Sequence, residues 1–200
     1  MKQAKTKNKL FRWGNWVLAV ALVLLATYYV VLPRIFPKKY EAYVTQYAAE
    51  YQLDPHLVYA VIFAESRSDE QAVSHKNAMG LMQITDGTGA WGAQMLEMEG
   101  YQTEDLFEPE TNIRIGCWYL RELINQFGLE ETALAAYNAG SGNVSEWLQN
   151  PAYSSDGVTL TEIPFGQTKR YVKKVMMVQK IYGFVYPSSS QSEKLSLIHI

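Results

Sequence analysis

The sequence predicts an all-α protein, built as a single helical domain behind one N-terminal transmembrane helix. Three observations predict this arrangement. Apolar residues recur with the spacing of a helix through most of residues 40–186. Residues 13–32 form an apolar stretch long enough to cross a bilayer. No run of alternating apolar and polar residues is long enough to predict a sheet, so any β-structure is expected to be minor.

The composition fits one globular domain with an accessory segment and excludes a chain that is disordered throughout. Of the 200 residues, 48% are hydrophobic and 19% are charged, and the formal net charge is −2. Residues 1–32 hold five basic and no acidic residues, which leaves 13 basic against 20 acidic residues in the remainder. That remainder has no broad basic field, so nucleic acid is not an expected partner.

The N-terminal segment has the pattern of a signal anchor. Residues 1–12 carry the basic cluster and are expected in the cytoplasm, because basic flanks stay on that side of the membrane. Residues 13–32 would span about 30 Å as a helix, with tryptophans near one end and tyrosines near the other as interfacial anchors. After a linker over residues 33–39, the rest of the chain is expected outside the cytoplasmic membrane.

A cleaved secretory signal is the alternative for this segment. It needs small residues at the cleavage site and a polar continuation. Leu24 stands where the first small residue would be needed before Ala26, and the run Tyr28–Val31 continues the apolar stretch. The pattern therefore favours an uncleaved anchor. Cys117 is the one cysteine in the sequence, so there is neither a lipidation site near the anchor nor an intramolecular disulfide.

The first half of the domain is predicted to hold three helices. The first covers Tyr40–Tyr51. The second begins at Pro55 with Asp54 as its N-cap, because proline is best tolerated in the first helical position. It is expected to run to about Arg67. After a polar turn, a third helix is expected over about Thr88–Glu97.

The second half is predicted to hold four further helices and one long loop. A helix over about Glu110–Phe127 ends at Gly128, which is a C-cap signal. Residues 150–166 are rich in Ser, Gly, Thr and Pro and are expected to form a loop. The tail over residues 187–200 is polar with an apolar end and has no predicted role. The other three helices are expected over Glu131–Asn138, Val144–Gln149 and about Gln167–Tyr182.

Glu65 ends an apolar helical stripe, where a charge is out of place. Val58, Val61 and Ile62 share its helical face. The ordinary role of such a glutamate is an ion pair with a neighbour such as Arg67. On this face, however, burial would raise the pKa of the carboxyl toward neutrality, where it can donate a proton. Glu65 is therefore a candidate general acid.

Four sequence blocks together resemble the lysozyme-like lytic transglycosylase (SLT) family. In the first, Glu65 and Ser66 precede a polar turn and the run Gly-Leu-Met-Gln-Ile at 80–84. The second is the run Asn-Ile-x-x-Gly-x-x-Tyr-Leu at 112–120. The third and fourth are Ala-Tyr-Asn-Ala-Gly-x-Gly-x-Val at 136–144 and Thr-x-x-Tyr-Val at 168–172. Each block alone is weak, but the ordered set, which covers about residues 41–182, is specific to the family.

The resemblance implies a lysozyme-like SLT domain over residues 40–186, on the wall side of a bacterial cytoplasmic membrane that the chain crosses once. Such domains cleave peptidoglycan glycan strands between N-acetylmuramic acid and N-acetylglucosamine without water. Glu65 would protonate the glycosidic oxygen and then, as a carboxylate, accept the proton of the muramoyl 6-hydroxyl, which closes a 1,6-anhydro ring. The substrate's acetamido group would stabilise the developing charge, so neither a second catalytic carboxylate nor a cofactor is expected.

The resemblance also implies a set of substrate-binding residues. Met82 and Gln83 would line the saccharide groove, and Tyr137 would lie across from Glu65. Gln167 departs from the family pattern, which usually has an acidic residue there, so the contribution of that charge is in question. The expected partners are peptidoglycan and the membrane reached through residues 13–32, with no protein partner predicted. The full substrate-binding set is Ser66, Met82, Gln83, Tyr137, Asn138, Gln167 and Tyr171.

Other classes of function are less well supported. His56, His75 and His199 show no spacing typical of metal ligands, so no metal site is expected. Ser66 lacks the Gly-x-Ser-x-Gly turn of a serine hydrolase. Lys169, Arg170, Lys173 and Lys174 are expected to form a solvated basic face. Two alternatives stay open: a muramidase that cleaves the same bond with water, and a weakly active glycan-binding scaffold.

Overall fold

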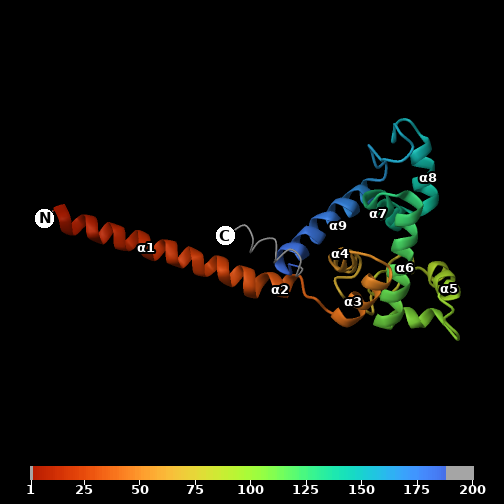
Figure 1. Ribbon diagram of the computed structural model, residues 1–200, viewed down its shortest axis with the longest axis horizontal. Coiled ribbons are helices and arrows are strands. Elements are labelled where there is room, and N and C mark those ends of the chain that lie inside the picture. The colour runs from red at the N-terminus through yellow and green to blue at the C-terminus, as the bar shows by residue number, and fades with distance from the viewer. Residues whose placement is uncertain (1, 188–200) are drawn as a thin grey trace. The chain divides into compact units, whose positions relative to one another are not determined.

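The computed structural model describes residues 2–187, and residues 188–200 of the predicted tail, with His199, lie outside them. The chain divides into two units, residues 1–38 and residues 39–200. Every regular element in the described part is helical, apart from two isolated β-bridges that join Val73 to Met79 and Met79 to Ile84 (Figure 1). The all-α prediction is confirmed.

The first unit is a nearly continuous helix. It consists of α1 (Lys2–Ala26), a π-helical segment (Thr27–Val31) and α2 (Leu32–Ile35). Pro33 does not end the helix at the predicted boundary, because it lies in the first turn of α2, where its missing N–H matters least. Asn15–Ile35, with 21 residues, is long and apolar enough to cross a membrane. At 1.5 Å per residue such a helix spans about 31 Å.

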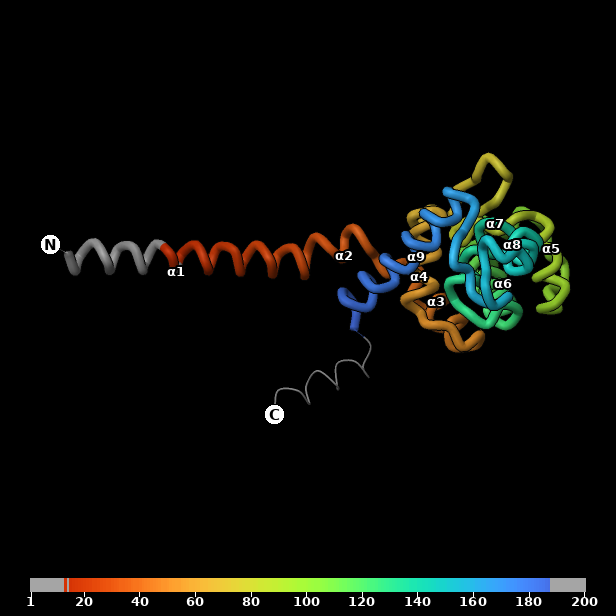
Figure 2. The backbone as a smooth tube through the Cα atoms, turned by 90° about the horizontal axis from the view of Figure 1, so that it is seen from above, coloured from red at the N-terminus to blue at the C-terminus, as the bar shows by residue number. Residues whose placement is uncertain are grey.

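One long-range helix pair forms the centre of the second unit. Helix α4 (Pro55–Glu65) packs along α9 (Gly166–Val185), and the two lie side by side in both views (Figures 1 and 2). The rings of Tyr59 and Tyr182 stack between them, 5.2 Å apart. All residues of α4 from Leu57 to Ile62 are buried, so it is a central helix that is apolar on every side rather than on one stripe.

Helix α4 has the predicted start and an earlier end. The Asp54 side chain accepts a hydrogen bond from the His56 backbone N–H, and Pro55 occupies the first helical position. The helix stops at Glu65 instead of Arg67, because Arg67 and Ser68 have positive φ angles of 55° and 65°, which a right-handed helix cannot contain. Glu65 is therefore the last helical residue.

The remaining helices surround this pair. Helix α6 (Pro109–Phe127) packs against α3 (Glu41–Glu50) and α7 (Glu130–Ala139). Gly128 ends α6 with φ 73°, as predicted. The other elements are α5 (Asp86–Met95), a 3₁₀ turn (Thr103–Phe107) and α8 (Ser141–Gln149).

Helices α5, α8 and α9 differ from their predicted limits by two or three residues at one end or both. The start of α5 has a clear cause, because the Thr85 hydroxyl accepts the Thr88 backbone N–H at 3.3 Å and caps a helix that begins at Asp86.

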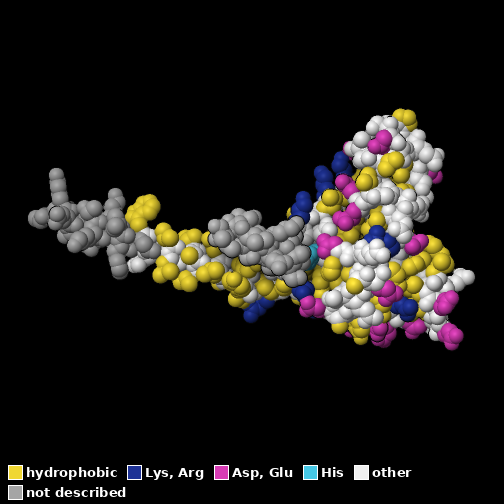
Figure 3. Space-filling model, in the orientation of Figure 1, with side chains coloured by type: hydrophobic (Ala, Val, Ile, Leu, Met, Phe, Trp, Pro, Cys, Tyr) yellow, Lys and Arg dark blue, Asp and Glu magenta, His cyan; other side chains and the backbone are white. Residues whose placement is uncertain are grey.

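The predicted basic face of α9 is only partly solvated. Arg170 and Lys173 are exposed, and Lys and Arg side chains follow the outer edge of this helix in Figure 3. Lys169 instead pairs with Glu162, at 2.8 Å. Lys174 turns inward toward the end of α4, where its Nζ donates to the backbone carbonyl of Ala64. The prediction that all four cations are solvated is thus wrong for Lys174.

Candidate active site

Glu65 lies at the C-terminal end of α4 and lines a cavity of about 160 Å³. One wall of the cavity is the irregular loop between α4 and α5, and the other is built from α7 and the start of α9. Within the described residues, Glu65 is the only carboxylate among the side chains that line it. The others are Ser74, His75, Lys76, Ala78, Gln83, Thr85, Tyr137, Asn138 and Gln167.

The surroundings of Glu65 favour its protonated form. Burial raises the pKa of this carboxyl from 4.5 to about 7, and the Tyr171 hydroxyl and the Lys174 ammonium oppose the rise without cancelling it. Near neutral pH the protonated and ionised forms are therefore both well populated. A group in this state can donate a proton in one step and accept one in the next.

Tyr171 places a buried hydroxyl beside this carboxyl. Its oxygen makes no hydrogen bond at normal bonding distance to any described residue, although it is close enough to Glu65 to favour the carboxylate. Burial raises the pKa of Tyr171 well above its ordinary value, so the phenol stays neutral and keeps its proton. A buried hydroxyl without a bonding partner is uncommon. Tyr171 is not among the side chains that line the cavity, so this hydroxyl is available to Glu65.

Lys174 lies one helical turn after Tyr171 and binds the end of α4. Its Nζ donates to the Ala64 carbonyl at 2.8 Å and lies 5.8 Å from the centre of the Phe63 ring. A cation at this end of a helix is favoured by the helix dipole. Burial is the main reason that the pKa of Lys174 is lowered, while the Glu65 carboxylate acts in the opposite direction.

Tyr137 and Asn138 at the end of α7 line the opposite wall. The Tyr137 hydroxyl donates to the Met82 carbonyl at 2.9 Å, so it holds the loop. The Asn138 side-chain oxygen accepts a hydrogen bond from the Thr168 hydroxyl at 2.9 Å, which fixes the orientation of the amide. Gln167, at the start of α9, also lines the cavity.

The expected role of Met82 in lining the groove is wrong. Its side chain is fully buried, and its sulfur lies 2.3 Å from the position that a Cβ on Gly116 would occupy. Ser66 is likewise outside the cavity lining. Its hydroxyl donates to the Leu81 carbonyl at 2.8 Å and ties the end of α4 to the loop. Both residues position the cavity wall from behind.

Gln83 lines the cavity but is also part of the loop's structure. Its side-chain nitrogen donates to the carbonyls of Ala72 and Gly80, at 3.0 and 2.9 Å. Its φ angle is 51°, in the left-handed region that few residues other than glycine adopt. The loop therefore holds Gln83 in one strained position that faces the cavity.

A buried amide from α6 fixes the same loop. The Asn112 side chain accepts the Met82 backbone N–H at 2.7 Å and donates to the carbonyls of Met79 and Leu106, at 2.9 and 2.7 Å. Gly80, with φ 74°, lies so close that an added Cβ would be 2.2 Å from the Leu106 oxygen. These contacts explain why an asparagine and a glycine occupy these two positions.

Comparisons with known proteins show which family this chain belongs to. A family model described as "Transglycosylase SLT domain" matches residues 42–157. The chain belongs to this family. Over 186 residues it is 34% identical to the soluble lytic murein transglycosylase of Escherichia coli K12, an alignment that covers 92% of this chain and 29% of the relative. Over 168 residues it is 30% identical to the membrane-bound lytic murein transglycosylase C of Yersinia pestis, covering 72% of this chain and 46% of the relative.

Solved structures give the same result for the SLT fold. The crystal structure of the 70 kDa soluble lytic transglycosylase from Escherichia coli matches with a TM-score of 0.69 and 30% identity, covering 90% of this chain and 30% of that one. The complex of the 70-kDa soluble lytic transglycosylase with bulgecin A matches with a TM-score of 0.70 and 30% identity, over 92% of this chain and 30% of that one. This chain thus spans less than a third of the first relatives it matches.

Several lining residues of this SLT domain were not predicted. Ser74, His75, Lys76 and Thr85 belong to the irregular loop, where no periodicity indicates which side chains face inward. The Ser74 hydroxyl accepts the backbone N–H groups of Lys76 and Ala78, which curls the loop at the cavity. Among the described residues there is no group of His, Cys, Asp and Glu side chains that could hold a metal ion.

Proposed function

We propose that this chain is a lytic transglycosylase, which cleaves the β-1,4 bond between N-acetylmuramic acid and N-acetylglucosamine in peptidoglycan. The observation that supports this most directly is the raised pKa of Glu65, about 7, on a carboxyl that faces a cavity at the end of a buried helix. Membership of the SLT domain family supports peptidoglycan as the substrate class.

In the proposed reaction, Glu65 acts first as an acid and then as a base. The protonated carboxyl gives its proton to the glycosidic oxygen as the bond from that oxygen to the muramoyl anomeric carbon breaks. The substrate's acetamido group stabilises the positive charge that develops on the sugar. The muramoyl 6-hydroxyl then attacks the anomeric carbon, and Glu65 recovers a proton from it. No water is consumed, and the enzyme returns to its starting state.

The neighbours of Glu65 support the second half of this cycle. After donating its proton, Glu65 is a carboxylate in a largely desolvated site, which is unfavourable. The Tyr171 hydroxyl and the Lys174 ammonium both favour the carboxylate, so they limit that cost. Gln83, Asn138 and Gln167 are the amide side chains around the cavity, and we assign them to the acetamido and hydroxyl groups of the sugars.

The N-terminal helix supports a second part of the proposal, that the enzyme is anchored in the cytoplasmic membrane with its SLT domain on the wall side. Asn15–Ile35 has the length and composition to span the bilayer once. The basic residues before it predict a cytoplasmic N-terminus. The test is fractionation of cells that make the full chain. A full-length product in the membrane fraction supports the anchor, and a shortened soluble product contradicts it.

The activity is tested by incubating the detergent-solubilised full chain with purified peptidoglycan and measuring the masses of the released muropeptides by mass spectrometry. The proposed reaction yields products that end in 1,6-anhydromuramic acid, one water lighter than hydrolysed products. Glu65→Gln is expected to abolish release. Glu146→Gln, which changes an exposed glutamate of α8, is the matched control and is expected to leave release unchanged. Products with only reducing ends would indicate a muramidase, and binding without release would indicate a scaffold.

A further inference from the structure

The outer side of α9 is basic in a unit that is otherwise acidic. Residues 39–200 hold 11 basic and 20 acidic residues, and five of the basic ones lie in α9, which has no acidic residue. Lys169 pairs with Glu162, and Lys174 turns inward to the end of α4. An anionic partner is attracted to such a side and repelled by the net acidic surface elsewhere. The three remaining cations of α9 are exposed, and these are Arg170, Lys173 and Lys180.

Apolar side chains lie between these exposed cations. Residues 170, 173, 177, 180 and 184 follow one another at intervals of three and four, so they lie along one side of the helix. Met177 is 57% exposed and Phe184 is 64% exposed, although both residue types are normally buried. Cations mixed with apolar side chains on one side of a helix are typical of helices that lie in the surface of a lipid bilayer. The α9 stripe is the set Arg170, Lys173, Met177, Lys180 and Phe184.

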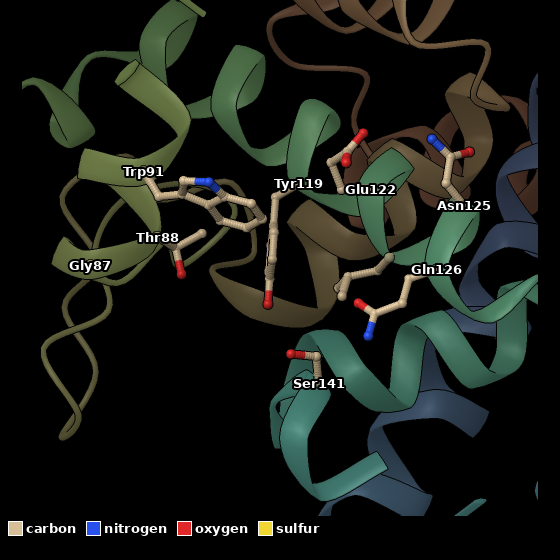
Figure 4. Close-up of a pocket in the computed structure, with 9 residues that line it drawn as sticks. Gly87, Thr88, Trp91, Tyr119, Glu122, Asn125, Gln126 and Ser141 are labelled. Carbon is tan, nitrogen blue, oxygen red and sulfur yellow. The ribbon is translucent and has the colours of Figure 1, made fainter. Parts of the chain in front are cut away.

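The α9 stripe belongs to neither of two cavities in this domain. Gln167 is the residue of α9 that lines the Glu65 cavity. A larger cavity, of about 580 Å³, lies beside α5 and α6, where Figure 4 shows Trp91, Tyr119 and Gln126. Its lining in the described part of the chain contains no residue of α9. The stripe is therefore a surface separate from both.

The linker limits how far the domain can be from the proposed anchor. The helix that can cross the membrane ends at Ile35, and α3 begins at Glu41. Residues 36–40 lie between them, and a fully extended chain of this length reaches at most about 20 Å. If the anchor spans the bilayer, the start of α3 is never further than this from the membrane.

The C-terminal end of α9 lies close to the start of α3. Burial raises the pKa of Tyr59 and of Tyr186, and the Glu41 carboxylate raises both further, so Glu41 is near these two rings. Tyr59 stacks on Tyr182 in the last turn of α9, and Tyr182 stacks on Tyr186 with 6.1 Å between ring centres. The end of α9 that carries Phe184 is therefore beside the point where the linker enters the domain.

We propose that the α9 stripe binds the anionic phospholipid headgroups of the membrane in which the chain is anchored. This inference rests on the anchor in the proposed function, because the short linker keeps α9 near the bilayer only if the N-terminal helix spans it. The cations contact the lipid phosphates, and Met177 and Phe184 enter the interfacial layer. The contact holds the SLT domain in one orientation on the bilayer. Carboxylates of the wall peptides would also attract these cations, but they offer no apolar layer for Met177 and Phe184.

The test places a fluorophore on the stripe of the full chain, reconstituted in lipid nanodiscs. Met177→Cys carries a dye whose emission depends on polarity, and the one native cysteine, Cys117, is buried and stays unlabelled. The emission is expected at shorter wavelength in discs that contain phosphatidylglycerol than in discs of phosphatidylcholine alone. Raising the salt to about 1 M, where the Debye length is about 3 Å, is expected to remove the difference.

Charge variants and a second label position show where the contact is. Changing Arg170, Lys173 and Lys180 together to glutamine is expected to abolish the wavelength difference. The matched control, Arg170→Lys with Lys173→Arg and Lys180→Arg, keeps the charges and is expected to keep the difference. Met95→Cys labels a 58% exposed residue of α5 and is expected to give the same emission in both discs. Muropeptide release in detergent, without a bilayer, is expected to be unchanged in the glutamine variant.

Every other result overturns the proposal. Equal emission from the Met177 label in both discs rejects the stripe as a lipid site, and a difference that survives the glutamine changes assigns the contact to other charges. An equal response at Met95 shows that the whole domain adheres to lipid. A response to soluble muropeptides but not to phosphatidylglycerol assigns the stripe to wall carboxylates.

Failure of the proposed function is read separately. A chain that does not enter the discs contradicts the anchor and, with it, the lipid contact. Loss of muropeptide release from the parent chain in detergent contradicts the function at Glu65 and leaves the lipid contact standing.

Discussion

The ammonium group of Lys174 donates a hydrogen bond to the backbone carbonyl of Ala64, the residue that immediately precedes Glu65. One side chain of α9 thereby fixes the end of α4 and places a positive charge near the proposed acid. Tyr171, one turn earlier on α9, brings its hydroxyl to the same carboxyl. Burial raises the pKa of Glu65, and both groups that oppose this rise thus belong to α9.

Lys174→Met is expected to shift the pH profile of muropeptide release upward. A nearby cation favours the carboxylate, so its removal raises the pKa of Glu65 beyond its value of about 7. The acid form then persists to higher pH, and the limb of the profile that reports loss of this proton moves with it. Lys173→Met, which removes an exposed neighbouring cation, is the control. Equal shifts in both variants would assign the effect to general surface charge.

Tyr171→Phe is expected to reduce release strongly while changing stability little. The hydroxyl has no partner at normal bonding distance in the described part of the chain. Its removal is therefore expected to lower the unfolding free energy by less than the ~1 kcal/mol of an ordinary hydrogen bond. Without it the pKa of Glu65 is expected to rise. Thermal unfolding and release rates check the two effects. A large fall in melting temperature would assign Tyr171 to the core instead.

Glu65→Gln is expected to stabilise the protein, and more so at alkaline than at acidic pH. The folded pKa of about 7 lies above the ordinary value of 4.5, so the folded state holds the proton more tightly than the unfolded state. The unfolding free energy therefore falls as pH rises between these values, by about 3 kcal/mol in total. Glutamine carries no charge and avoids this loss. Melting temperatures at about pH 8 and about pH 5 test this, and a gain that does not depend on pH would contradict it.

Gly80→Ala is expected to destabilise the domain by about 2–4 kcal/mol and to reduce release. The new Cβ would collide with the Leu106 carbonyl and with the Asn112 amide, each 2.2 Å away, and φ 74° is unfavourable for alanine. Gly142→Ala is the matched control, because a Cβ there meets nothing within 4 Å. Chemical denaturation measures both. An equal loss of stability at the two glycines would show that the collision at Gly80 is not responsible.

The sequence predicted the helices and the position of Glu65 well. Helical periodicity and end signals such as Asp54, Pro55 and Gly128 are local, so they appear in the sequence as they do in the fold. Glu65 was identified because an apolar helix and a family block meet at that residue. Its role in catalysis stays a proposal.

The direction of side chains in irregular or shared surroundings was not predictable. Met82 lies two residues after Gly80 in a block that marks the groove, yet it points into the core, because Gly116 on α6 leaves room for it there. Lys174 follows an exposed lysine and turns inward, because the end of α4 offers a free carbonyl. Trp91 is exposed, although tryptophan side chains are highly buried on average. In each case the deciding partner lies far away in sequence.

The contact between Met82 and Gly116 has a consequence for how this sequence can change. The thioether fills the space that any side chain at position 116 would need, so the two residues share one fixed volume. Enlarging position 116 requires a smaller residue at 82, and reducing 82 alone leaves a hole behind the cavity wall. Either substitution alone is therefore expected to be harmful, and only the two together are expected to be tolerated. Residues 82 and 116 are thus expected to change together in evolution.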